Sequence, residues 1–115
     1  MEFTEQILNK PIKREELAPL SLKMEPHLIK AVVDIEKGII AIDASMHVDL
    51  RDILLENGSA PMNLWGINLY PDNPSEELVE FDSMINIRPP INRSRSIEDE
   101  SIREKILTVV KKWIQ

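Results

Sequence analysis

Three arginines lie close together in the stretch NIRPPINRSRS, residues 86–96. Arg88, Arg93 and Arg95 could hold a phosphate or a carboxylate, because guanidinium groups form paired, charge-assisted hydrogen bonds with such anions. Backbone N–H groups at the start of the helix predicted next would add to such a site. Glu98–Glu100 follow at once, however, and could occupy the positive helix end and pair with at least one arginine. The sequence leaves both interpretations open, an external anion site and a set of internal ion pairs.

A second group of polar residues alternates along two predicted strands, 64–70 and 78–88. Alternate residues of paired strands share a face. One polar face is therefore expected to carry Asp34, Asn68, Tyr70, Asp82, Asn86 and Arg88. Asn and Asp are poor strand formers, which favours a function over the alternative of a solvated face on a one-sided sheet. The candidate ligand-binding residues are Asn68, Asp82, Asn86, Arg88, Asn92, Arg93 and Ser94.

Few other residues carry recognisable chemistry. The chain has no cysteine, which excludes disulfides, thiol nucleophiles and cysteine-bound metals. His27 and His47 lack the spacing of metal ligands, and His47 is interpreted as a helix-entry residue. No phosphate-binding loop, dinucleotide fingerprint or nucleophile elbow is present, so we predict no metal and no cofactor. One alternative stays open, a carboxylate-only metal site that uses Asp34, Asp43 or Asp82.

Chain length, net charge and the length of the apolar runs indicate the class of protein in which these residues act. A chain of 115 residues fits a single domain, 1–115, with residues 1–10 extended or loosely attached. The formal net charge of -6 argues against nucleic-acid binding, which needs a basic surface. The longest apolar runs are too short to span a membrane, and the N-terminus lacks the pattern of a signal peptide. The cytoplasm is therefore the expected location.

The elements that must position the candidate residues follow from periodicity and turn residues. In order, we expect a helix after Pro11 that Pro19 shortens, a hairpin around Gly38, a helix at 48–57, strands at 64–70 and 78–88, and a helix at 98–114. Hairpins dominate, so the predicted fold class is α+β. It has an antiparallel sheet of about four strands in two hairpins, with two to three helices packed on one face.

Local details follow from the same patterns. Asp49 is the expected N-cap of the second helix and Ser96 is a candidate cap of the last one. Trp113 is predicted to pack in the core near Trp65, because both lie on apolar faces. Met62 and Met84 are expected to be packing residues rather than part of a binding surface.

Three strings in the second half of the chain resemble a known family. They are LLENGS at 54–59, LWGINLYP at 64–71 and FDSMINIRP…NRS…IED…IR at 81–103. The chain is similar, from about Pro11 to its C-terminus, to a family of short prokaryotic proteins that share a domain of unknown function. The resemblance implies a small cytoplasmic protein and no particular activity.

Two hypotheses for the function follow. The first is a binding or regulatory module that acts through a protein partner or a small anionic ligand, with a homodimer among the forms that the sequence allows. The second is an enzyme for a phosphorylated or carboxylated substrate, with Asp82 as the base and Arg88 and Arg93 as anion clamps. The sequence leaves open whether the protein is an enzyme. Whether Asp82, Asn86 and Arg88 converge in a concave pocket would distinguish the two.

Overall fold

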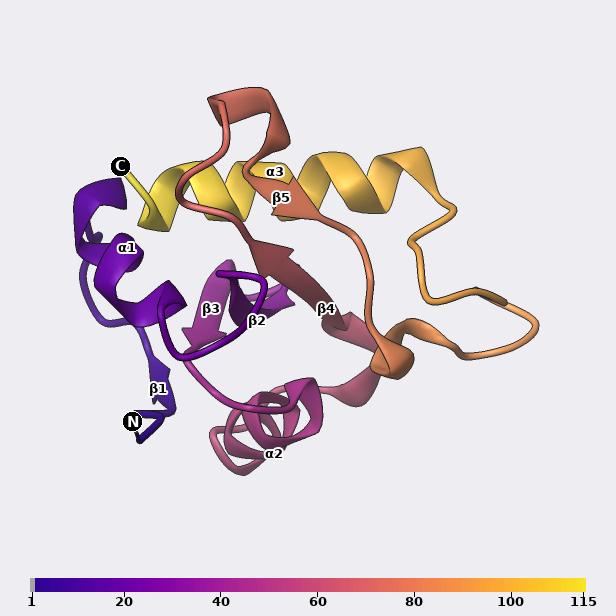
Figure 1. Ribbon diagram of the computed structural model, residues 1–115. Coiled ribbons are helices and arrows are strands. Elements are labelled where there is room, and N and C mark those ends of the chain that lie inside the picture. Colours follow the sequence, from indigo (N-terminus) through magenta and orange to yellow (C-terminus); the bar gives the residue numbers. More distant parts are fainter. Residues whose placement is uncertain (1) are drawn as a thin grey trace.

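The computed structural model describes residues 2–115 and contains a five-stranded antiparallel sheet with three α-helices. The sheet order is β1-β3-β2-β4-β5 (Figure 1). The predicted α+β class is confirmed, with one strand more than expected. The strands are β1 Gln6–Ile7, β2 Ile29–Asp34, β3 Ile39–Ile42, β4 Leu64–Leu69 and β5 Val79–Glu80, and the helices are α1 Arg14–Ser21, α2 His47–Glu56 and α3 Glu100–Trp113.

The hairpin of β2 and β3 forms the centre of the sheet, as its two β-branched runs predict. Val33 pairs with Ile40 across it. Gly38 takes a φ of +67° in the turn, a conformation that residues with a Cβ rarely adopt. The additional strand is β1, which pairs with the outer edge of β3. Leu8, which follows β1, is buried, so this part of the N-terminal segment is attached to the sheet.

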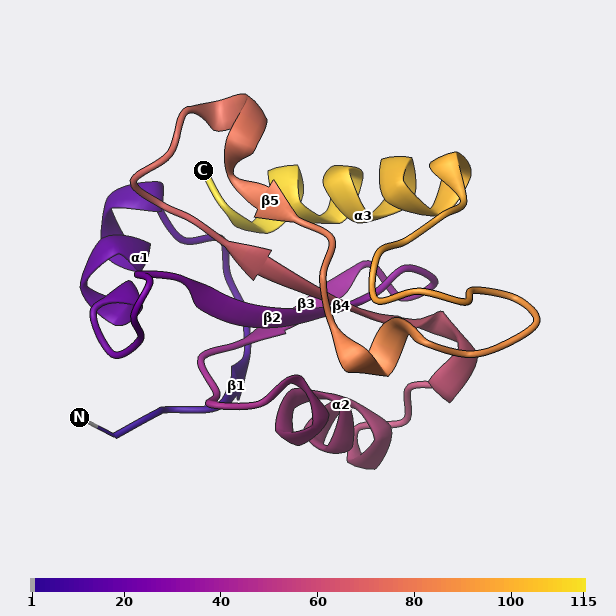
Figure 2. The same ribbon diagram turned by 45° about the vertical axis from the view of Figure 1, so that its right-hand side comes forward.

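The helices cover both faces of the sheet, which corrects the prediction that all of them pack on one face (Figure 2). Val33 contributes to the core under α1 and α3, whereas its neighbour Val32 contributes to the core under α2. The sequence reason is the run Ala31-Val32-Val33, in which successive residues are apolar. A strand with apolar residues on both faces is typical of a sheet that is covered on both sides.

The C-terminal helix α3 matches its prediction closely. Asp99 caps it by accepting a hydrogen bond from the Ser101 N–H at 2.8 Å, a position that the sequence assigned to Ser96. A hydrogen bond from the Ser101 hydroxyl, together with this backbone bond, holds the pKa of the Asp99 carboxyl below its usual value. Trp113 and Trp65 lie in the same core cluster, as predicted. No helix within residues 2–115 combines the length and the apolar character needed to cross a membrane.

Candidate functional site

The second predicted hairpin exists, but its outer strand is much shorter than expected. β5 ends at Glu80, and the chain then forms a 3-10 turn at Met84–Asn86, which we call η3. The predicted alternation along 78–88 therefore breaks after Glu80. The candidate residues of this segment consequently take individual positions rather than sharing one strand face.

Asn86 replaces the missing part of the outer strand. Its side-chain amide is fully buried, and its Oδ1 accepts a hydrogen bond from the Gly66 N–H at 2.8 Å. Its Nδ2 donates to the Gly66 carbonyl at 2.9 Å and to the Arg95 carbonyl at 3.0 Å. Gly66 is required here, because a Cβ at this position would stand 2.6 Å from the side chain of Ser83.

Arg88 closes the same edge of β4 one step further along. Its guanidinium donates to the Leu64 carbonyl at 2.5 Å and to the Met62 carbonyl at 3.2 Å. It also stacks on the Trp65 ring, 3.9 Å from the centroid. The backbone groups of Leu64, Gly66 and Asn68 point to the same side of β4, and the third of these residues pairs with β5. Asn86 and Arg88 thus continue the edge that β5 begins.

Residues 87–99 connect η3 to α3, and we call this segment the arginine loop; it projects beyond the sheet (Figure 1). Asn92 holds the loop in place. Its buried Nδ2 donates to the carbonyls of Asn86, Ser94 and Ser96 at 2.7–3.0 Å. Its Oδ1 accepts from the Glu98 N–H at 3.0 Å. A single side chain therefore fixes the course of the loop.

The arginines of the loop do not pair with Glu98–Glu100 as expected. Arg95 instead forms an ion pair with Asp82, at 2.8 Å between Nε and Oδ1. Glu98 accepts a hydrogen bond from the backbone N–H of Arg93, whose guanidinium makes no ion pair with residues 2–115. Within the same range, no hydrogen bond or ion pair joins Asp82 to Arg88 or Arg93, the three residues of the enzyme hypothesis. The predicted pairing with Glu98–Glu100 is therefore wrong, and the acid that pairs with the loop is Asp82.

The carboxylates of the alternative metal site are also separate. Asp34 accepts hydrogen bonds from the Ser59 hydroxyl and from two backbone N–H groups of the hairpin turn. Asp43 forms an ion pair with Lys23 at 2.8 Å. Asp82, as described, pairs with Arg95. Each of the three therefore has its own structural partners.

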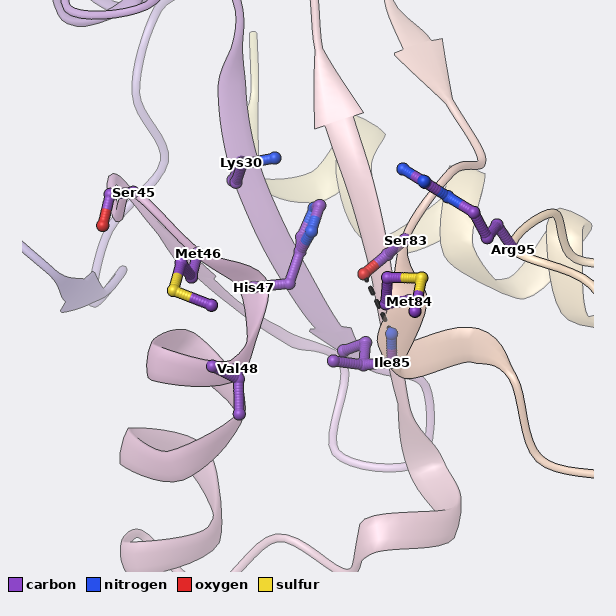
Figure 3. A pocket seen from close by; sticks show the side chains of 9 residues that line it. All are labelled: Lys30, Ser45, Met46, His47, Val48, Ser83, Met84, Ile85 and Arg95. Atoms are coloured by element: carbon purple, nitrogen blue, oxygen red, sulfur yellow. Dashed lines mark hydrogen bonds between the residues drawn. The ribbon is translucent and has the colours of Figure 1, made fainter.

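A pocket of about 200 Å³ lies where the start of α2 faces β2 and η3 (Figure 3). Lys30 and Arg95 extend into it from opposite sides, toward the space beside the His47 ring. It opens on the face of the sheet that α2 covers. The residues that line it are Lys30, Ser45, Met46, His47, Val48, Ser83, Met84, Ile85 and Arg95.

His47 is the most distinctive residue of this pocket. It is the first residue of α2, which begins with Met46 as its N-cap and not with Asp49 as predicted, and only 7% of it is exposed. Its Nε2 lies 2.8 Å from the Ile67 carbonyl, so Nε2 carries the proton and Nδ1 is the acceptor of the neutral ring. Burial lowers the pKa of His47 from 6.5 to about 4. The imidazole is therefore neutral at physiological pH.

Two further side chains of the sheet lie near the imidazole. Lys30 on β2 is directly opposite Asn68 on β4 in the strand register, and its positive charge contributes to the lowered pKa of His47. The Asn68 amide donates to Glu80 at 2.9 Å. The Asn68 Oδ1 atom is buried and has no hydrogen-bond partner among residues 2–115. His47 thus lines the pocket, whereas Asn68 lies beside the imidazole and is not one of the lining residues.

Lys30 and His47 were missed as candidates by reasoning from the sequence. Their signals are visible in retrospect. Lys30 is the one cation in the apolar strand sequence IKAVVD. Met46 occupies the N-cap of α2 and makes no side-chain cap hydrogen bond, although Ser, Thr, Asp or Asn is preferred there.

A comparison with protein families bears on the whole chain. The family described as "Protein of unknown function (DUF5674)" matches residues 6–113. The chain belongs to the DUF5674 family. This confirms the resemblance seen in the sequence to a domain of unknown function. No curated protein and no solved structure matches this DUF5674 chain.

The lowered pKa of His47 predicts a pH-dependent stability. Between pH 6.5 and about 4 the unfolded chain binds a proton that the folded chain excludes, so the free energy of unfolding falls as the pH drops. A difference of this size corresponds to about 3 kcal/mol. Urea denaturation at a series of pH values would measure it. His47→Gln should remove this part of the pH dependence, whereas His27→Gln, at an exposed position, should retain it.

Proposed function

We propose that the protein is a binding module for a small ligand that carries a phosphate or carboxylate group and a hydrogen-bond donor. The observation that carries this proposal is the pocket at the start of α2, where two cations flank a buried, neutral imidazole. Lys30 and Arg95 suit the anionic group. The acceptor His47 Nδ1 suits a hydroxyl or an amine of the same ligand.

The charges around the pocket support an anion. Lys30 has no carboxylate partner within ion-pair distance among residues 2–115. Arg95 is paired with Asp82, but its side chain remains 57% exposed and can bind a second anion on its open side. The pocket thus has one unpaired cation and one that is paired and accessible.

The start of α2 adds hydrogen-bond donors. Neither the His47 N–H nor the Val48 N–H donates a hydrogen bond to any of residues 2–115. Free N–H groups at a helix start attract negative charge through the helix dipole. The volume of about 200 Å³ is below the range of about 300–1,000 Å³ that is usual for drug-sized ligands. We therefore expect a ligand of metabolite size.

The test is thermal and urea unfolding of the protein with inorganic phosphate or glycerol phosphate, at constant ionic strength set with sodium chloride. A ligand that binds only the folded state raises the free energy of unfolding by about 2.7 kcal/mol at one hundred times its dissociation constant. Glycerol phosphate should bind more tightly than inorganic phosphate, because one of its hydroxyls can donate a hydrogen bond to His47 Nδ1.

Variants identify the site. Lys30→Gln should weaken binding at least tenfold, and Asp82→Asn should strengthen it by releasing Arg95. Lys111→Gln on α3 removes an exposed charge outside the pocket and serves as the matched control, with unchanged affinity expected. Equal affinity of the wild type and Lys30→Gln for both phosphates would contradict the proposal.

A further inference from the structure

A second hollow, of about 270 Å³, lies beside the pocket of His47. The side chain of Ile85 lines both, so the two form neighbouring parts of one surface. The second hollow is bounded by α2, by η3 and by the 3-10 turn Pro61–Asn63, which we call η1. Its lining residues are Arg51, Pro61, Met62, Ile85, Ile87 and Arg88.

The two arginines of this hollow lack an anionic partner within residues 2–115. Arg51 makes no hydrogen bond or ion pair with that part of the chain, although its Nε is buried. Burial of the Arg88 guanidinium lowers its pKa, and the positive charge of Arg51 lowers it further. A buried donor without an acceptor and two like charges side by side are both unfavourable. A carboxylate placed between the two guanidinium groups would offset the repulsion between their charges.

Apolar side chains stand exposed around the same hollow. Met62 is 71% exposed and Ile87 38% exposed. Met84, which lines the neighbouring pocket of His47, is 65% exposed. Met62 and Met84 are thus not the packing residues that the sequence predicted. Exposed methionines are common on surfaces that bind other proteins, because their flexible side chains adapt to a partner.

We propose that this arginine hollow docks an acidic, partly apolar segment of a protein partner. A carboxylate of the partner lies between Arg51 and Arg88, and a neighbouring apolar side chain rests on Met62 and Ile87. Charge complementarity supports an acidic partner, because neither guanidinium has a carboxylate partner within residues 2–115, on a chain whose net charge is -6. The hollow adjoins the proposed ligand pocket at Ile85, but the docking proposal does not depend on the function of that pocket.

The experiment uses the whole protein and a fluorescein-labelled peptide of four Glu-Leu repeats. Peptides of Lys-Leu and of Glu-Ser repeats, together with an oligouridine, serve as comparison probes. Fluorescence anisotropy measures affinity, and methyl NMR of the methionines locates the contact. We expect the Glu-Leu peptide to bind at least tenfold more tightly than the other probes, and to shift the Met62 methyl signal while that of Met24 stays in place.

Arg51→Gln is the decisive variant, because this side chain makes no hydrogen bond within residues 2–115 whose loss would unfold the protein. It should weaken Glu-Leu binding at least tenfold, as should Met62→Ser. Lys105→Gln, which removes an exposed cation from α3, should leave the affinity unchanged. Equal binding by Arg51→Gln and wild type, a preference for the Lys-Leu peptide or oligouridine, or no binding of the Glu-Leu peptide would each overturn the proposal.

Discussion

Replacing Asn86 by alanine should lower the free energy of unfolding by about 3–5 kcal/mol. The change removes three side-chain hydrogen bonds and leaves the Gly66 N–H and the Gly66 carbonyl without partners, whereas the Arg95 carbonyl keeps the hydrogen bond from the Ser83 N–H. Each buried group left unsatisfied costs about 1–3 kcal/mol. Equilibrium denaturation in urea would measure the loss.

Two variants make this test specific. Asn86→Asp should destabilise the protein almost as much, because a carboxylate cannot donate to the Gly66 carbonyl. Asn73→Ala removes an amide of the same type from an exposed turn, where its one long hydrogen bond is 3.4 Å, and should change stability by less than about 0.5 kcal/mol. A similarly small effect for Asn86→Ala would show that the amide does not hold β4 and η3 together.

The second large effect is expected for Trp113→Ala, again about 3–5 kcal/mol. Trp113 is only 9% exposed and packs into the core between α3 and the sheet. Its Nε1 also donates to the Gly38 carbonyl at 2.7 Å, which ties the end of α3 to the turn of the central hairpin. Removing the ring therefore opens a cavity and frees that turn.

Trp113→Phe separates the contribution of ring packing from that of the Nε1 hydrogen bond. It keeps most of the apolar contact but loses the hydrogen bond to Gly38, so about 1 kcal/mol of its effect should come from the bond itself. Leu107→Ala on the partly exposed side of α3 is the control and should cost less than either change. An unchanged urea midpoint for Trp113→Ala would contradict the packing described for α3.

The α+β class and the elements with strong periodicity were predictable. The hairpin around Gly38 and the amphipathic helix α3 each carry a local pattern that only one structure satisfies. The position of α2 was not predicted, although the consecutive apolar residues Val32 and Val33 indicate a strand with two covered faces. The early end of β5 was missed too, because alternation continues in the sequence after Glu80 where the hydrogen-bonded ladder does not.

The candidate site was harder to predict for a physical reason. Asn86 and Asn92 are unusual strand and loop residues because they satisfy buried backbone groups, a role that has the same sequence signature as ligand binding. The pocket at His47 depends on residues far apart in the chain, such as Lys30 and Arg95. Only the register of β2 with β4 and the path of the arginine loop bring them together.

The coverage of the β4 edge by Asn86 and Arg88 also affects how this protein could aggregate. A strand edge with free N–H and C=O groups is a template for a strand of another molecule. Arg88 and Asn86 occupy that edge at Leu64 and Gly66. Strand exchange or fibril growth at β4 must therefore begin with the detachment of residues 84–88. A substitution that loosens this short segment would lower stability. It would also expose the backbone N–H and C=O groups of β4 that residues 84–88 cover in the native fold.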